Sequence, residues 1–405
     1  MNKTSKNLRP KEASQEPEYL RLNLKGMGPF GEPFDHHGDE LVYAFGGISG
    51  EEVVARVVRR FKDRVLAQVE EVVSPSPHRV EAPCSYFGAC TGCQWQHIDY
   101  SHQLELKRQT VQKEMDSYPS LAGIDVLPTL ASPQELHYRN HARFTVGHEG
   151  DLGFVNSATR SFVRVDHCKL MDPWINEALQ EMQDKCDETS QLSVRYGINT
   201  GDWLIQPSLL NADIALQSGQ THYEESLEGK RFRVAASSFF QVNTRQTEQM
   251  SALIQDRLKL TGEGVLVDAY AGVGTLGVLM APKVTKVVAI EESPSAVKDA
   301  AINTLGIYNI EFCLGKTEDV LEGLEQVPDY VILDPPRKGC HPQTLETLIK
   351  RAPGKIAYVS CEPESLARDL DILVEGPFRL DEVQPIDMFP QTYHTECLAI
   401  LSRKD

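Results

Sequence analysis

The sequence predicts an α/β protein whose C-terminal part is a doubly wound, mostly parallel sheet. Two observations carry this prediction. From about residue 246 onwards, apolar strand-like segments alternate strictly with helical segments, as in a parallel sheet covered by helices on both faces. A glycine-rich stretch, GVGTLG at 272–277, follows one of these strands, at the edge where such sheets bind ligands.

The elements of this C-terminal part follow one another in order. Helices are expected at 246–258, 274–281, 293–306, around 342–351 and at 362–373, where charged and apolar residues recur with helical spacing. Strands are expected where short apolar runs are rich in valine, isoleucine and tyrosine, at 264–270, 286–291, 328–334, 355–360 and 396–404.

The rest of the chain has a different pattern. Short alternating segments punctuated by glycine at 17–76 predict a small β-barrel. The proline-rich SPSPHRVEAPC at 74–84 is typical of a linker. We therefore expect a loose tail at 1–16, a barrel at 17–76, a central domain at 77–235 and a C-terminal domain at 236–405.

Composition limits the function classes. The first twenty residues contain no apolar signal-peptide core, so a cytoplasmic protein is expected, without a membrane span. Its nine cysteines are then reduced thiols or metal ligands rather than disulfides. A net charge of −17 disfavours broad, non-specific binding to phosphates but permits a local basic groove.

Several acidic residues follow the predicted strands. Glu291 ends a strand 19 residues after Gly272, where a carboxylate can accept ribose hydroxyls, and Asp268 lies inside the preceding strand. ILDPPRKG at 332–339 adds Asp334 and two prolines that form a rigid lip. The glycine loop and Glu291 alone would also suit a nicotinamide cofactor, so an NAD-dependent oxidoreductase is one alternative.

A cysteine stands at another strand end. YVSC at 358–361 closes with Cys361, just before a predicted helix. A helix N-terminus favours a thiolate, whereas a free cysteine is more often simply buried in a core. Taken alone, Cys361 would be assigned to the core.

Five motifs together resemble the RNA uracil-5 methyltransferases. DAYAGVGTLG, VVAIEESPSAV, ILDPPRKG, YVSCEPESLARDL and HTECLAIL occur in the order and spacing of that family, and SFFQVN at 238–243 matches the stretch before its catalytic domain. The resemblance implies a Rossmann-like methyltransferase domain, an OB-like N-terminal barrel of the TRAM type, and S-adenosylmethionine as cofactor. The implied cofactor contacts are Gln241, Tyr270, Gly272, Glu291 and Asp334, while Thr275 stands where relatives often have asparagine.

The chemistry of this family needs a cysteine and a carboxylate. C5 of uracil becomes nucleophilic after a thiolate adds to C6, and a base must then remove the C5 proton. Cys361 supplies the nucleophile and Glu396 the proton acceptor; His394 either orients the site or is a solvated loop histidine. Arg337 occupies the position where amine methyltransferases carry an aromatic residue after Pro-Pro, which favours methylation of carbon.

A cysteine cluster occupies the central domain. Cys84, Cys90 and Cys93 form C-x5-C-x2-C, and Cys168 is the expected fourth ligand. Four thiolates hold either a [4Fe–4S] cluster or a zinc ion, and the spacing alone does not decide. The resemblance implies the [4Fe–4S] cluster in a structural role within this central α+β domain.

RNA is the expected partner, and no obligate protein partner is evident. Five basic residues in ARVVRRFKDR (55–64), and Arg139 and Arg143 interleaved with Tyr138, His137 and His141, suit single-stranded RNA. Through the barrel and the cysteine cluster, the family resemblance implies 23S ribosomal RNA as substrate, with tRNA as an alternative. A further alternative is an RNA-binding or assembly protein without turnover, against which the Cys361–Glu396 pair argues.

Overall fold

The computed structural model describes residues 17–188 and 190–404, and the chain forms two compact units that meet in sequence at Arg79 and Val80. The tail predicted at 1–16 lies outside the described residues. No helix in the described ranges is long and apolar enough to cross a membrane.

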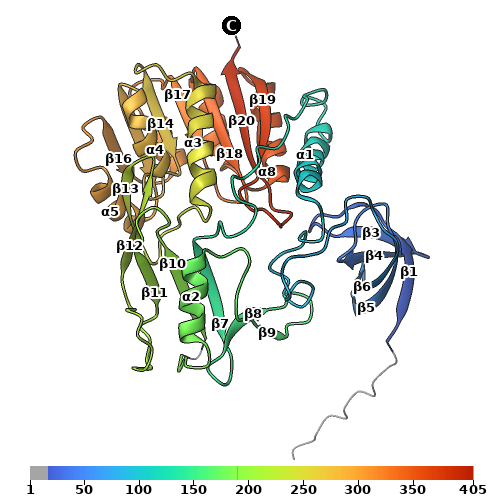
Figure 1. Cartoon of the computed structure of the whole chain (residues 1–405). Coiled ribbons are helices and arrows are strands. Elements are labelled where there is room, and N and C mark those ends of the chain that lie inside the picture. Colours follow the sequence, from blue (N-terminus) through green and yellow to red (C-terminus); the bar gives the residue numbers. More distant parts are fainter. Residues whose placement is uncertain (1–16, 189, 405) are drawn as a thin grey trace, which may run out of the picture. The chain divides into compact units, whose positions relative to one another are not determined.

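The N-terminal unit is a barrel-like sheet of six strands in the order β1-β5-β6-β4-β3-β2 (Figure 1). Alternate residues of its strands, such as Leu20, Leu22, Val42 and Ala44, fill the core because successive strand side chains point to opposite faces. The strands are β1 (Tyr19–Asn23), β2 (Lys25–Met27), β3 (Pro33–His37), β4 (Glu40–Phe45), β5 (Glu52–Arg60) and β6 (Val65–Ser74).

The second unit begins with the cysteine segment and a helix, α1 (Tyr100–Asp116), whose first turn is capped by Asp99. An antiparallel five-stranded sheet, β11-β10-β7-β8-β9, follows and packs against α2, and a two-stranded hairpin leads into the last part of the chain. These elements are β7 (His141–Val146), β8 (Leu152–Val155), β9 (Phe162–Arg164), α2 (Pro173–Met182), β10 (Gln191–Tyr196), β11 (Trp203–Gln206), β12 (His222–Leu227) and β13 (Lys230–Ala235).

A seven-stranded sheet forms the remainder, in the order β16-β15-β14-β17-β18-β20-β19 (Figure 1). Five strands are parallel, and β20 pairs antiparallel with both β18 and β19. The elements are α3 (Thr244–Leu258), β14 (Val265–Ala269), α4 (Thr275–Met280), η1 (Ala281–Lys283), β15 (Lys286–Glu291), α5 (Pro294–Asn303), β16 (Ile310–Leu314), α6 (Thr317–Gly323), β17 (Tyr330–Leu333), α7 (Pro342–Arg351), β18 (Lys355–Ser360), α8 (Pro363–Glu375), β19 (Phe378–Ile386) and β20 (Glu396–Arg403).

Helices cover both faces of this sheet, as the alternation predicts. Within β14, Val267 and Ala269 pack with α1, α6, α7 and α8, whereas Leu266 packs with α3 and α4 on the other face. Strands buried on both faces leave only their ends for chemistry, so the carboxyl edge of the sheet is where a site can form.

Candidate active site

The predicted site residues lie along one edge of the seven-stranded sheet. Glu291 ends β15, Asp334 follows β17 and Cys361 follows β18, all at carboxyl ends of parallel strands. Because β20 runs antiparallel to β18, its first residue reaches the same edge, and that residue is Glu396. Sheet topology therefore gathers side chains that are far apart in the sequence, from Glu291 to Glu396.

Cys361 and Glu396 come from neighbouring strand ends. Ser360 pairs with Cys397 in the register of β18 and β20, so the next position along each strand brings Cys361 beside Glu396. The Cys361 side chain is partly exposed, whereas only 4% of Glu396 is exposed. The pair thus combines a reachable thiol with a sheltered carboxyl group.

Burial and charge set the protonation of this pair. Burial, with the neighbouring Glu396 and Asp334, raises the pKa of the Cys361 thiol to about 11, while Arg337 opposes the rise. Burial and Asp334 raise the pKa of Glu396 well above its ordinary value, again against Arg337. The N-terminus of α8, expected to favour the thiolate, is therefore outweighed by burial and by the nearby carboxyl groups.

Arg337 and His394 flank the pair. The positive charge of Arg337 acts on Cys361, Glu396 and His394 alike, which places the guanidinium within electrostatic reach of all three. Burial, Arg337 and two other cations lower the pKa of His394 to about 4, so its ring is neutral at pH 7. That ring packs against Tyr393 at 4.2 Å between centroids and is not a freely solvated loop histidine.

A small cavity of about 50 Å³ lies at the ends of β14 and β17. Four of the five residues implied as cofactor contacts line it together with Thr275: Gln241, Tyr270, Gly272 and Asp334. Burial raises the pKa of Asp334 and of the neighbouring Asp268 to about 7 each. The cavity thus presents acidic groups whose ionised form a cationic ligand would favour.

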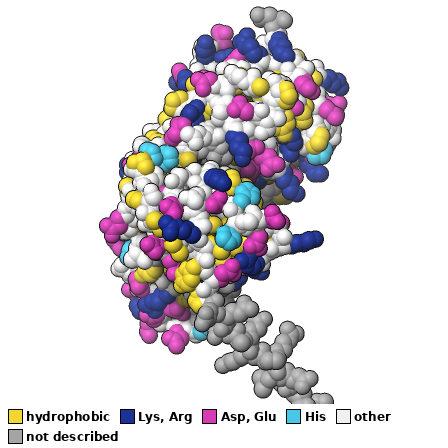
Figure 2. Space-filling model, turned by 90° about the vertical axis from the view of Figure 1, so that its right-hand side faces the viewer, with side chains coloured by type: hydrophobic (Ala, Val, Ile, Leu, Met, Phe, Trp, Pro, Cys, Tyr) yellow, Lys and Arg dark blue, Asp and Glu magenta, His cyan; other side chains and the backbone are white. Residues whose placement is uncertain are grey.

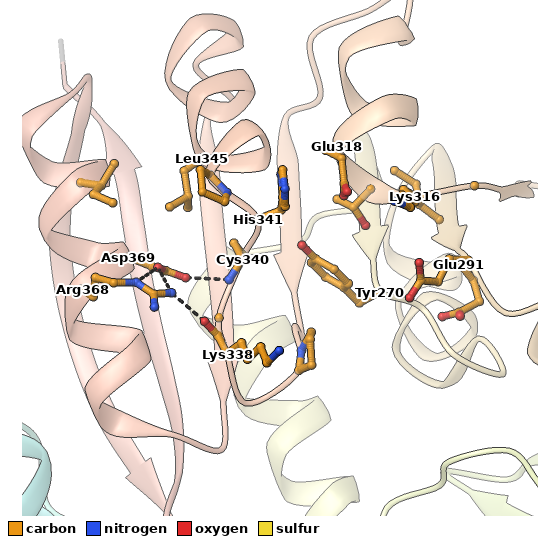
Figure 3. A pocket seen from close by; sticks show the side chains of 18 residues that line it. Tyr270, Glu291, Lys316, Glu318, Lys338, Cys340, His341, Leu345, Arg368 and Asp369 are labelled. Carbon is orange, nitrogen blue, oxygen red and sulfur yellow. Dashed lines mark hydrogen bonds and ion pairs between the residues drawn. The ribbon is translucent and has the colours of Figure 1, made fainter.

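A larger pocket of about 780 Å³ adjoins the same strand ends (Figure 3). Tyr270 lines both cavities, and Glu291, the fifth implied contact, lines the larger one. In Figure 3, Tyr270 and Glu291 project from one side of this pocket, while Arg368, Asp369 and Cys340 face them from the other.

Backbone geometry fixes these residues before any ligand arrives. The carboxylate of Glu291 accepts hydrogen bonds from the backbone N–H groups of Gly272 (2.8 Å) and Ser293 (2.7 Å), and each oxygen retains a further lone pair. Tyr270 has a φ of 65°, a strained conformation for a bulky residue, immediately before the glycine turn. Such strain persists only where the surrounding structure holds it, as at ligand sites.

Phe239 was missed by the sequence analysis. Its side chain is 71% exposed and lines the small cavity beside Gln241, whereas its neighbour Phe240 is buried. The two adjacent phenylalanines in SFFQVN could have revealed it. Neighbouring side chains of an extended segment point to opposite sides, so one of the two was expected to stay outside the core.

The four cysteines predicted as ligands surround one cavity of about 310 Å³. Cys84, Cys90, Cys93 and Cys168 line it, and Gln96 donates a hydrogen bond to the Cys93 sulfur at 3.1 Å. Within residues 17–188 and 190–404, no three His, Cys, Asp or Glu side chains are arranged to hold a single metal ion. Four thiols around one cavity are a ligand set that either a zinc ion or a [4Fe–4S] cluster can use.

The segments predicted to hold RNA differ from expectation in part. Tyr138 is fully buried and donates to the Pro390 carbonyl at 3.1 Å, so its ring is unavailable for stacking on a base. Arg139, His141 and Arg143 instead line the cysteine cavity.

The basic run at 55–64 of the N-terminal unit is partly neutralised. Arg56, Arg60 and Arg64 form ion pairs with acidic residues of that unit. On the face shown in Figure 2, basic and acidic side chains are interspersed.

Comparison with known proteins identifies the family. Residues 213–404 match the model of the tRNA (uracil-5-)-methyltransferase family. The chain is 33% identical to an uncharacterized RNA methyltransferase of Gloeobacter violaceus, covering 90% of this chain and 92% of that one, and 32% identical to one of Listeria monocytogenes over 96% and 98%. The solved structure of Pyrococcus abyssi tRNA (uracil-54, C5)-methyltransferase, in complex with S-adenosyl-L-homocysteine, superposes with a TM-score of 0.76 at 26% identity over 94% of this chain and 99% of that one.

These relatives and the sheet-edge site define an enzyme that methylates RNA. The chain belongs to the RNA uracil-5 methyltransferase family. The predicted family and α/β fold class are thereby confirmed, whereas the iron–sulfur cluster and the roles of individual residues stay predictions.

Proposed function

We propose that this enzyme uses S-adenosylmethionine to methylate C5 of one uridine in structured RNA, with 23S ribosomal RNA as substrate. One observation carries the mechanism: the antiparallel pairing of β18 with β20 brings Cys361 and Glu396 to the same sheet edge as Asp334. A nucleophile and a base beside a cofactor cavity are the minimum that uracil-5 methylation requires.

The proposed reaction runs in three balanced steps. The Cys361 thiolate adds to C6 of uracil, and the electron pair of the C5–C6 double bond moves into an enolate. C5 then takes the methyl group from the sulfonium, whose C–S electron pair leaves with the cofactor. Glu396 finally accepts the C5 proton, the double bond re-forms, and the thiolate departs from C6.

The residues around the pair support these roles. The positive charge of Arg337 stabilises the thiolate and the ionised carboxylate, since it lowers the pKa of both groups. The acidic cavity with Gln241, Tyr270, Gly272 and Asp334 suits the cationic half of the cofactor, and Glu291 suits its ribose hydroxyls. The target uridine must leave its stack to reach Cys361.

We also propose that Cys84, Cys90, Cys93 and Cys168 hold a [4Fe–4S] cluster, with zinc as the alternative. The four thiols line one cavity, and Arg139 and Arg143 beside them offset the negative charge of a thiolate-ligated cluster. Its role is structural: the group ties two sequence-distant segments together.

A second substrate class is supported by the comparisons. The superposed Pyrococcus abyssi enzyme acts on tRNA at uracil 54, and the matching family model is also described for tRNA. We therefore take tRNA as the alternative substrate class to 23S ribosomal RNA.

Covalent capture tests the mechanism and the substrate together. The protein, purified without oxygen, is incubated with S-adenosylmethionine and 5-fluorouridine-substituted rRNA or tRNA, then run on a denaturing gel. Fluorine at C5 leaves no proton for Glu396 to remove, so we expect a stable protein–RNA adduct with the true substrate class.

Cys361→Ala should abolish the adduct, whereas Cys313→Ala, a matched change at another partly exposed cysteine, should not. An adduct that persists in Cys361→Ala would refute the assigned nucleophile. An adduct with tRNA alone would replace the rRNA assignment.

A further inference from the structure

A buried lysine lies far from the reacting atoms in sequence but next to the segment that leads to Glu396. Lys107 on α1 is 0% exposed. Its ammonium group donates to Asp387 Oδ1 at 2.5 Å, to the His394 carbonyl at 2.7 Å and to the Phe389 carbonyl at 3.2 Å. An ammonium has three protons, so all of them are directed into the segment between β19 and β20.

The middle of this connecting segment, residues 387–395, is held by a residue of α1 and by two residues that precede this helix. Gln103, one helical turn before Lys107, donates to the Gln391 side-chain oxygen at 3.0 Å and accepts from the Gln391 backbone N–H at 3.1 Å. The backbone N–H groups of Gln94 and Trp95 donate to the Gln391 carbonyl at 3.2 and 3.1 Å. Gln391 adopts a φ of 69°, a conformation that needs such external support.

Two more side chains complete the attachment of the connecting segment. Tyr138 donates to the Pro390 carbonyl at 3.1 Å, and Asn243 donates to the Met388 carbonyl at 3.3 Å. A loop of this length is usually mobile, but here residues 388–391 and 394 are each bonded to another part of the unit.

The connecting segment ends at the proposed base. His394, whose carbonyl accepts from Lys107, is two residues before Glu396, the first residue of β20. From Glu396 onwards, β20 is held by pairing with β18 and β19. Just before Glu396, the chain is held by the bond from Lys107 to the His394 carbonyl. A buried ion pair is weak evidence for stability, because apolar residues of similar size often serve as well, so its presence here suggests a role in geometry.

We propose that Lys107 is a positioning residue for Glu396: it holds the 387–395 segment so that the carboxylate faces C5 of the methylated uracil. The proposal rests on the proposed role of Glu396 as base. It predicts a selective defect. Cysteine addition and methyl transfer do not use Glu396, so they proceed, whereas proton removal from C5 and release of the thiolate slow down.

The test uses unsubstituted substrate RNA and methyl-labelled S-adenosylmethionine. Because Lys107→Met alone leaves Asp387 buried without its cation, the variant of choice is Lys107→Met with Asp387→Leu, which removes both charges. We expect turnover to fall about 10²-fold, as for a misplaced catalytic group. A methyl-labelled protein–RNA adduct should accumulate on a denaturing gel, as it should in Glu396→Gln.

Two control variants on α1 separate positioning from mere loss of stability. Lys113→Met makes the same change at an exposed lysine and should behave as the unaltered protein. Val111→Ala weakens the buried face of the helix, so turnover and adduct should fall together. Turnover of the double variant within about two-fold of the unaltered protein, or a parallel loss of turnover and adduct, would overturn the proposal.

Glu396→Gln and Cys361→Ala distinguish failure of the underlying mechanism. If Glu396→Gln forms no adduct, or Cys361→Ala still turns over, the proposed function fails and the role of Lys107 falls with it. If both behave as expected and only the double variant does not, the role of Lys107 alone is wrong.

Discussion

At the scale of single residues, the site is governed by which charges surround the thiol. Burial, followed by Glu396 and Asp334, opposes ionisation of Cys361, and Arg337 favours it. The balance leaves the pKa of the thiol at about 11, so the reactive thiolate is a minor species at pH 7. Any change in the surrounding charge should therefore appear directly in the reactivity of this cysteine.

Arg337→Met should raise the pKa of Cys361, because the substitution removes the cation that lowers it. At pH 8 to 9, where the thiolate fraction is still small, alkylation of Cys361 by iodoacetamide should slow, and its pH profile should move to higher pH. Mass spectrometry of the peptide that contains Cys361 measures this rate. An unchanged profile would mean that Arg337 does not act on the thiol; Lys338→Met, on the adjacent residue, is the control.

Binding of S-adenosylmethionine should tighten as the pH rises through 7. Burial raises the pKa of Asp334 and Asp268 to about 7, and a sulfonium and an ammonium favour their ionised forms. Protons are then released on binding below that pH, and the dissociation constant falls between pH 6 and 8. Calorimetry at both pH values measures this, and Asp334→Asn should flatten the dependence; equal affinity at both pH values would contradict the assignment.

At the scale of elements, the start of α4 depends on a close approach that only glycine permits. A Cβ atom on Gly277 would lie 2.9 Å from Asp268 Oδ2, the same oxygen that accepts from the Gly277 N–H at 2.7 Å. This contact joins the end of β14 to the helix that follows the glycine loop.

Gly277→Ala should therefore destabilise the protein by about 1–3 kcal/mol, as other overpacked substitutions do, and weaken cofactor binding. Chemical denaturation with and without cofactor measures both effects. Gly323→Ala is the matched control, because a Cβ there meets nothing within 4 Å in helix α6. If the two variants lost the same free energy of unfolding, the close approach at Gly277 would not contribute to stability.

The segment that contains Cys84, Cys90 and Cys93 leads to a second prediction at this scale, on the metal group that it binds. Protein purified without oxygen should contain about four iron and four sulfide per chain, the content of one [4Fe–4S] cluster. Cys84→Ser should lose most of the iron, whereas Cys186→Ser, at a buried cysteine away from the cavity, should keep it. One zinc per chain without iron would decide for the alternative.

At the scale of the whole molecule, the protein is negatively charged and so is its RNA substrate. The net charge is −17, and three of the five basic residues at 55–64 are already paired with carboxylates. We therefore expect recognition of RNA through few phosphate contacts and through the shape of the folded substrate.

The affinity for RNA should depend only weakly on salt. Each phosphate contact to a single strand contributes about 0.7 to the slope of log K against log salt, so we expect a slope of about 2 to 3 in magnitude. Arg59→Ala with Lys62→Ala should lower it by about one if the N-terminal unit contributes. A much steeper slope, as for a basic RNA-binding protein, would mean that RNA lies in a cationic groove and would contradict this prediction.

Much of the catalytic domain could be predicted from the sequence, because its strands are apolar on both faces and its helices are regular. β16, α6 and β19 were missed: β16 is a short edge strand with a mixed pattern, α6 has only seven residues, and β19 contains Pro385. The edge residues Glu291, Asp334, Cys361 and Glu396 were predicted because each stands at a strand end in a motif that resembles the uracil-5 methyltransferases; taken alone, Cys361 would have been assigned to the core.

The central domain and the support of the site could not be predicted in the same way. Helix α2 and most strands of the five-stranded sheet are short and joined by loops, so their periodicity is weak. Lys107 and Asp387 are 280 residues apart, and no local pattern reveals that a lysine on a mostly polar helix is fully buried. Burial of Tyr138 likewise depends on a tertiary contact, with Pro390.

The row of carboxyl groups along the sheet edge has a consequence for the order of events. Asp268 and Glu396 are buried and Asp334 is partly exposed. Burial raises the pKa of all three carboxyl groups, and Asp334 adds to the rise at Asp268 and Glu396, so this edge of the sheet resists further negative charge. A cationic methyl donor should offset that negative charge, so we expect RNA, a polyanion, to bind more readily after the cofactor. Methyl transfer removes the sulfonium charge, so the repulsion should return and favour release of both products. The same electrostatics would thus load the enzyme in one order and empty it after each turnover.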